Sequence, residues 1–227
     1  MRSRSAAGRS PWTTALGLLF AAVVLLGLAV GIGLLVTRAE TGTAVEEVDS
    51  GADEWFADQR TPTLDAASDT LDELGNTAVV AAVGLVAATA GSLALRHWRP
   101  AAVLALALGG ELAIFLTTTA LIDRPRPPVV HLDAELPPTS SFPSGHTAAA
   151  ICLYGGIAAL VLAATRAWWR WLVLTAAVVV VAVVAVARLY RGAHFPTDVL
   201  GSVAFAVPWL LVVLRLVPPT PPRAPVR

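Results

Sequence analysis

The 227-residue chain has no lysine, a single cysteine and only 14% charged residues, while 56% of its residues are hydrophobic. So little charge excludes an ordinary soluble domain. Cys152 has no partner cysteine, which excludes an intrachain disulfide framework and a cysteine-based metal site. The formal net charge of zero gives no general attraction to nucleic acid, so we expect no nucleic-acid partner.

Long apolar runs are what the sequence has in abundance. Six of them have about the length that crosses ~30 Å of hydrocarbon as a helix. Lipid leaves no partner for backbone polar groups outside a helix, so each run should be helical. The runs are Trp12–Val36, Thr77–Leu95, Ala101–Ile122, Thr147–Thr165, Trp171–Ala187 and Val199–Val217. We therefore expect an all-α polytopic bundle of six transmembrane helices, a single domain over residues 1–227 with its core at about 77–217.

Charge is divided unevenly between the two ends of these runs. If the N-terminus is cytoplasmic, the segments on that side carry nine arginines and no acid, whereas eleven carboxylates lie between Glu40 and Glu73. The nine are Arg2, Arg4, Arg9, Arg96, Arg99, Arg166, Arg170, Arg223 and Arg227. The positive-inside rule then places both termini in the cytoplasm of a cell-membrane protein. The first run, of about 25 residues, is too long for a cleavable signal and should remain as an anchor.

The external segment at about 38–76 mixes apolar and acidic residues. Apolar residues recur among the acids at a spacing that predicts one or two short amphipathic helices at the membrane interface. They are Trp55, Phe56, Leu64 and Leu71. Such helices suit either a lid or lipid-entry ledge, or a plain solvated connection.

Three short polar segments fall at the ends of apolar runs on this same external side. In the one from Arg188 to Asp198, Pro196 suits the first turn of a helix, which brings Asp198 within reach of His194. A carboxylate on one ring nitrogen fixes the histidine tautomer and leaves the other nitrogen free to attack phosphorus. A helix-capping acid beside an interfacial histidine is the alternative.

The other two segments suit phosphate binding. Gly145 lets the backbone approach a ligand closely at a helix N-terminus, and His146 could protonate a leaving alkoxide. Arg124 and Arg126 offer forked donors for phosphate oxygens. Taken singly, these residues also fit a turn with a cap and a pair of interfacial anchors. Together, the three segments indicate chemistry on a phosphate at the outer membrane face.

These motifs resemble those of the type 2 phosphatidic acid phosphatase family, integral membrane lipid phosphatases whose helical core is shared with vanadium haloperoxidases. The family signatures are Lys-x6-Arg-Pro, Pro-Ser-Gly-His and Ser-Arg-x5-His-x3-Asp. The chain matches the end of the first, all of the second and most of the third. The matching residues are Arg126-Pro127, Pro143-Ser144-Gly145-His146, and Arg188, His194 and Asp198.

The resemblance implies a role for each matching residue. His194 would form a phosphohistidine, Asp198 would orient it, and His146 would act as general acid and then as base. The phosphate would be held by Arg126, Arg188, Ser144 and the Gly145 N–H. The family needs no metal ion or other cofactor.

Two positions depart from the signatures. Thr119 stands in place of the lysine, or Thr117 if the count ends at Arg124, and Ala187 stands in place of the serine. We include Thr119 among the phosphate-binding candidates, and Arg124 or Arg191 could supply the missing cation.

The sequence as a whole predicts a membrane lipid phosphate phosphatase acting on phosphatidic acid, phosphatidylglycerol phosphate or a polyprenyl diphosphate. A phosphotransferase that uses the same histidine and a non-catalytic lipid-phosphate-binding paralogue are the alternatives. The expected partners are the lipid substrate and the bilayer. Glu111, about 12 residues or ~18 Å below Asp123, should lie too deep to touch the phosphate, so its role stays open between function and interhelical bonding.

Overall fold

The computed structural model describes residues 10–39, 42–133, 136 and 139–219, and regular structure in these ranges is helical throughout. The elements are α1 (Pro11–Arg38), α2 (Ala44–Asp58), α3 (Pro62–Asp72), the 3₁₀ turn η1 (Glu73–Gly75), α4 (Thr77–Leu95), α5 (Arg99–Leu121), α6 (Gly145–Ala164), α7 (Arg170–Tyr190) and α8 (Pro196–Leu216). Five arginines used above to assign sides lie outside the described residues: Arg2, Arg4, Arg9, Arg223 and Arg227.

Six helices, α1 and α4 to α8, are long and apolar enough to cross a membrane. They coincide with the six apolar runs, so the predicted all-α six-span architecture is confirmed. Local chemistry marks where several of them begin. Prolines occupy the first turns of α1, α5 and α8, where a missing N–H costs nothing. The Ser10 and Asn76 side chains cap α1 and α4 by accepting backbone N–H bonds.

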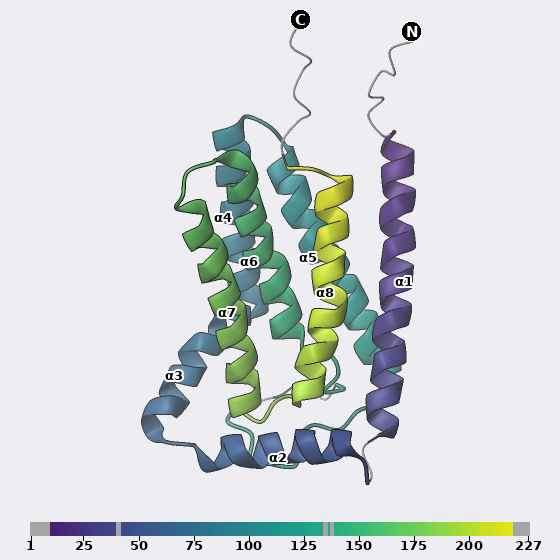
Figure 1. Ribbon diagram of the computed structural model, residues 1–227, viewed down its shortest axis with the longest axis vertical. Coiled ribbons are helices and arrows are strands. Elements are labelled where there is room, and N and C mark those ends of the chain that lie inside the picture. Colours follow the sequence, from purple (N-terminus) through teal and green to yellow (C-terminus); the bar gives the residue numbers. More distant parts are fainter. Residues whose placement is uncertain (1–9, 40–41, 134–135, 137–138, 220–227) are drawn as a thin grey trace, which may run out of the picture.

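α6 is the central helix of the bundle and packs against α4, α5, α7 and α8, while α1 packs against α5 and α8 from outside (Figure 1). The helices approach most closely where α5 meets α8. A Cβ atom on Gly110 would lie 1.9 Å from Cζ2 of Trp209, so only glycine fits there. The Trp209 indole N–H donates to the Ala107 carbonyl at 3.0 Å. This contact fixes α5 relative to α8, and both helices lead into the polar segments.

The segment between α1 and α4, for which one or two short helices were predicted, forms two, α2 and α3. α2 lies across one end of the bundle and α3 leads from it toward α4 (Figure 1). Two carboxylates of α2 face inward, since Asp49 and Asp53 are each 2% exposed, whereas Trp55 is 57% exposed. Trp55 and Leu64 line an apolar groove of about 550 Å³ between these helices and α7. α2 is therefore amphipathic, but it turns carboxylates toward the protein.

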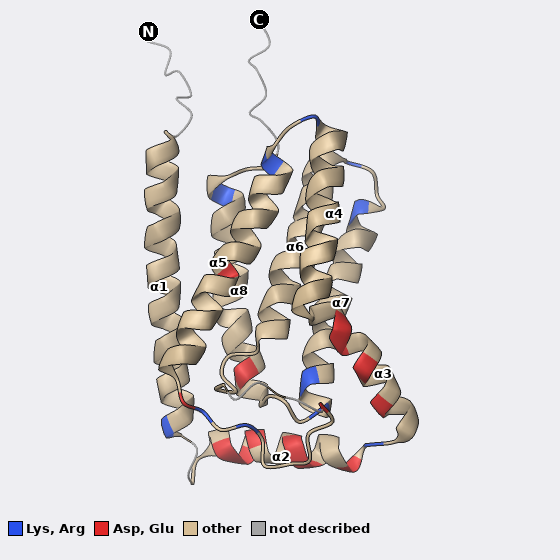
Figure 2. Cartoon of the chain, turned by 180° about the vertical axis from the view of Figure 1, so that it is seen from behind, with Lys and Arg blue, Asp and Glu red and all other residues tan. Residues whose placement is uncertain are grey.

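The two ends of the bundle differ in charge. Acidic residues gather on α2 and α3 at one end, and the coloured positions at the opposite end are arginines (Figure 2). The described chain begins at Ser10 and stops at Pro219 at that opposite, arginine-bearing end.

Candidate active site

The N-terminus of α6 lies in a recess below the end of α5. A Cβ on Gly145, the first residue of α6, would lie 2.8 Å from the Phe115 ring of α5. α5 continues for six more residues to Leu121, roughly 9 Å at the helical rise. The Pro-Ser-Gly-His segment therefore opens α6 inside the bundle and not at its rim.

A cavity of about 370 Å³, which we call the histidine cavity, extends from this recess between α4, α5 and α6. Its polar end is lined by His146, His194, Arg126 and Arg188, which come from the three polar segments singled out in the sequence. The remaining wall is mostly apolar and comes from α4 and α5, with Val80, Ala81, Leu108, Leu112 and Phe115. Four of the residues singled out from the sequence thus meet in a cavity whose wall is otherwise mostly apolar.

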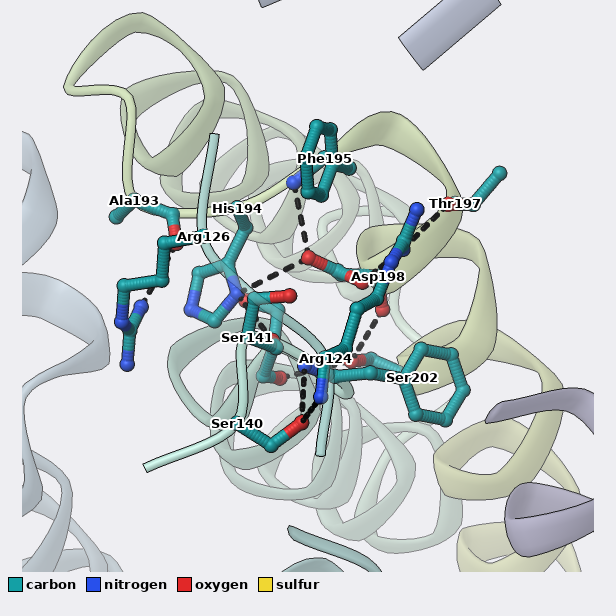
Figure 3. A network of polar contacts seen from close by, with 12 residues as sticks. Arg124, Arg126, Ser140, Ser141, Ala193, His194, Phe195, Thr197, Asp198 and Ser202 are labelled. Carbon is teal, nitrogen blue, oxygen red and sulfur yellow. Dashed lines mark hydrogen bonds and ion pairs between the residues drawn. The ribbon is translucent and has the colours of Figure 1, made fainter. Parts of the chain in front are cut away.

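His194 is held from one side, as Figure 3 shows. Its Nδ1 atom lies 2.6 Å from the Ser141 carbonyl oxygen and 3.6 Å from Oδ2 of Asp198. Because a carbonyl can only accept, Nδ1 carries the proton and Nε2 keeps its lone pair. Burial lowers the pKa of the His194 imidazole, and the positive charge of Arg188 lowers it further, while Asp198 opposes both. The geometry and the electrostatics both favour a neutral ring with Nε2 available for attack.

Asp198 lies in the first turn of α8 and is fully buried. One carboxylate oxygen accepts the Phe195 N–H at 2.9 Å, and the other is bound by the Arg124 guanidinium. Arg124 also donates to the Thr197 hydroxyl at 2.7 Å (Figure 3). It binds Oδ2 of Asp49 at 2.8 Å as well. The buried Arg124 guanidinium therefore joins the segment after α5 to the start of α8 and to the inward side of α2.

Arg188 is held at the cavity by two carboxylates that sequence reasoning did not single out. Its Nη1 lies 2.6 Å from Oδ2 of Asp72 and 3.1 Å from Oδ2 of Asp133. The same Asp72 oxygen is 3.8 Å from Nε2 of His146. Burial raises the pKa of Asp72, although Arg188 opposes the shift. A Cβ on Gly75 would lie 2.8 Å from that of His146, so the turn after α3 packs directly against the second histidine.

The PAP2 superfamily model matches residues 100–221, which is more than half of the chain. The match includes every polar residue assigned to the site above except Asp49 and Asp72. The chain belongs to the PAP2 superfamily. It is a multi-pass membrane protein and a lipid phosphate phosphatase of that family. No curated protein matches it.

Two solved structures share the PAP2 fold with this chain. One is the first transmembrane PAP2-type phosphatidylglycerolphosphate phosphatase from Bacillus subtilis, with a TM-score of 0.72 and 24% identity over 86% of this chain and 94% of that one. The other is Aquifex aeolicus LpxE, with a TM-score of 0.54 and 22% identity over 70% of this chain and 91% of that one. At these identities the likeness concerns the fold.

Pro143 and Gly145 also line the cavity, whereas the remaining PAP2 signature positions lie around it. Thr119, where the signature has lysine, donates its hydroxyl to the Ser140 carbonyl at 3.4 Å. The Ser144 and Thr147 hydroxyls bond to each other at 3.0 Å. Ala187, where the signature has serine, lines the apolar groove beside α7.

The two arginines suggested as replacements for the PAP2 lysine are both engaged elsewhere. Arg124 is 2% exposed and bound by Asp49 and Asp198. Arg191 is bound by Asp133 at 2.5 Å and Asp69 at 3.1 Å. Neither lines the histidine cavity. Arg126 does, and it is anchored by a bond from Nη1 to the Ala193 carbonyl at 2.7 Å.

Asp49, Asp72 and Asp133 are the site residues that the sequence did not reveal. The sequence did show a surplus of acids and several arginines at the same end of the predicted spans. It could suggest such pairs but could not select their members. Within the described ranges, no group of His, Cys, Asp and Glu residues could hold a metal ion.

Proposed function

We propose that this chain hydrolyses a phosphomonoester or a diphosphate carried by a lipid, with His194 as covalent nucleophile. The observation that carries the proposal is the histidine cavity, which brings together His146, His194, Arg126 and Arg188 and whose remaining lining is mostly apolar. A lipid phosphate is divided in the same way, into a charged head and an apolar tail.

In the first step, Nε2 of His194 attacks phosphorus in line, and the bond between phosphorus and the lipid oxygen breaks. His146 gives a proton to the departing oxygen. A monoester then yields the lipid alcohol, and a diphosphate yields the lipid monophosphate. In both cases the phosphoryl group stays on His194.

In the second step, neutral His146 takes a proton from water, and the water oxygen attacks the phosphorus of phosphohistidine. The phosphorus–nitrogen bond breaks and inorganic phosphate leaves. Arg126 and Arg188 stabilise the charge on the equatorial oxygens in both steps, together with the Gly145 N–H at the start of α6. Arg188 exchanges one of its two carboxylate partners for the phosphate when the lipid binds.

The remaining predicted residues support these groups from outside the cavity. Asp198 keeps His194 in the tautomer with Nε2 free, and we assign Arg124 to hold Asp198 and not to touch phosphate. Thr119 and Ser144 hold the segment that ends in His146, through the Ser140 carbonyl and Thr147.

We further propose that both termini are cytoplasmic and that the cavity opens on the external side of the cell membrane. The support is the distribution of charge. Arg96, Arg99, Arg166 and Arg170 lie at the end of the bundle where the described chain begins and stops, and α2 with its acids lies at the other.

A phosphate-release screen of purified protein tests the function. The lipids are phosphatidic acid, phosphatidylglycerol phosphate and a polyprenyl diphosphate, in detergent micelles. At least one should release phosphate, and His194→Ala should abolish release without unfolding the protein. His97→Ala, a matched substitution between α4 and α5 at the opposite end, should leave the rate unchanged. An active His194→Ala variant would rule out the proposed nucleophile. Transfer of phosphate to an added alcohol instead of water would indicate a transferase.

A further inference from the structure

Glu111 is the one acidic residue of α5, and it lies within the span (Figure 2). It is 3% exposed, and it lines the histidine cavity together with His146 and His194. The proposed reaction does not use it. A buried ionisable group that shares a cavity with reacting residues requires a physical explanation.

The distance between Glu111 and the reacting groups is smaller than the sequence suggests. Glu111 does lie about 12 residues from the end of the polar segment at Asp123, but the phosphate site is not at the level of Asp123. Gly145 packs against Phe115, and Glu111 is four residues from Phe115, about 6 Å at the helical rise. Glu111 therefore lies roughly one helical turn beneath the start of α6.

The Glu111 carboxyl makes no hydrogen bond or ion pair with any residue in the described part of the chain. Buried polar groups nearly always make hydrogen bonds, so we expect the Glu111 carboxyl to bond to a group that occupies the cavity. The surrounding wall is apolar, with Leu108 and Leu112 on the same helix. An unpaired carboxylate is strongly disfavoured in such surroundings, and the neutral acid offers one O–H donor.

The histidine cavity reaches from the reacting residues to the level of Glu111. Gly109, Glu111 and Leu112 line it from α5, together with His146 and His194. The Glu111 carboxyl, with one unused hydrogen-bond donor, therefore borders the same cavity of about 370 Å³ as the two histidines.

We propose that Glu111 is a specificity-determining residue that donates a hydrogen bond to an acyl-ester carbonyl of the substrate. The proposal rests on the proposed function, which places phosphorus at the histidines. In an acylated glycerol phosphate, the nearer ester carbonyl oxygen is about six bonds from phosphorus, roughly 6 Å along a bent chain. That matches the one turn between Gly145 and Glu111. Ether-linked and polyprenyl chains carry no carbonyl at this distance and would leave the donor unpaired.

The test compares a dioleoyl phosphatidic acid with its diether analogue, which differs only in lacking the two carbonyls. The wild-type protein should have a kcat/KM several-fold higher for the diester. Glu111→Leu should lower kcat/KM for the diester about tenfold, mainly through KM, and leave the diether nearly unchanged. Glu111→Gln keeps an N–H donor and should retain the diester preference.

Leu112→Ala is the matched control, because it alters the same wall of the cavity without changing a polar group. It should affect the two lipids equally. Equal turnover of diester and diether by the wild-type protein would overturn the proposal, as would an equal loss on both in Glu111→Leu. Those results leave the phosphatase function intact, whereas a wild-type protein that hydrolyses neither lipid, nor any lipid of the wider panel, contradicts both.

Discussion

Replacing Arg124 by glutamine distinguishes a phosphate-binding role from a structural one. Arg124 is 2% exposed, and it joins Asp49 to Asp198, which are 2% and 0% exposed. Its removal leaves two buried carboxylates without their cation. Breaking a buried pair in this way costs about 3–5 kcal/mol. In a chain of this size the melting temperature should fall on the order of 10 °C. Because Asp198 also loses its anchor beside His194, kcat should fall at least tenfold.

The assay combines thermal unfolding in detergent with steady-state phosphate release. Arg215→Gln, an exposed arginine near the other end of α8, is the control and should change stability by less than about 0.5 kcal/mol. Adding Asp49→Asn to Arg124→Gln should recover part of the lost stability, because a neutral amide then replaces one of the two unpaired carboxylates. A variant with an unchanged melting temperature, an unchanged kcat and a raised KM would refute this reasoning. That pattern would assign Arg124 to the phosphate.

Two further predictions concern pH. Since burial lowers the pKa of His194, the ring stays neutral below its ordinary pKa of 6.5. The fall of kcat/KM on the acid side should therefore be centred below pH 6.5. A fall centred at or above pH 6.5 would contradict the buried setting of His194. Both oxygens of Asp53 are buried without a hydrogen-bond partner in the described chain, and burial raises its pKa from 3.8 to about 7. The folded state therefore loses stability as pH rises from about 4 to about 7, by at most about 4 kcal/mol. Asp53→Asn should melt higher than the wild-type protein at pH 8 and equally at pH 4, and equal melting at pH 8 would show that Asp53 has a partner.

The six spans could be predicted because a single physical quantity, apolar length, determines them. The starts of α1, α5 and α8 were also readable, since proline and capping residues act within one turn. The packing order was not readable. Every span is similarly apolar, so nothing local indicates that α6 is central. The close approach at Gly110 depends on Trp209, which lies on a different helix.

The depth of the site was the main quantity that the sequence could not give. Counting along α5 places Glu111 far from Asp123, and that count is right for one helix. It assumes, however, that neighbouring helices begin at the same level. The contact between Gly145 and Phe115 shows that α6 begins lower, so the histidine cavity reaches into the span. Vertical offsets between helices arise from tertiary packing and leave no periodicity in the sequence.

The acidic partners of the arginines pose a different problem, which electrostatics explains. An arginine buried near a membrane must be paired, so the buried Arg124 and Arg188 require acidic partners. Charge balance thus predicts that such acids exist. It does not identify them, because Arg124 and Asp49 are 75 residues apart, and Arg188 and Asp72 are 116 apart. Motif spacing captures pairs within one turn, such as His194 with Asp198, whereas a pair between distant segments is defined only once the helices have packed.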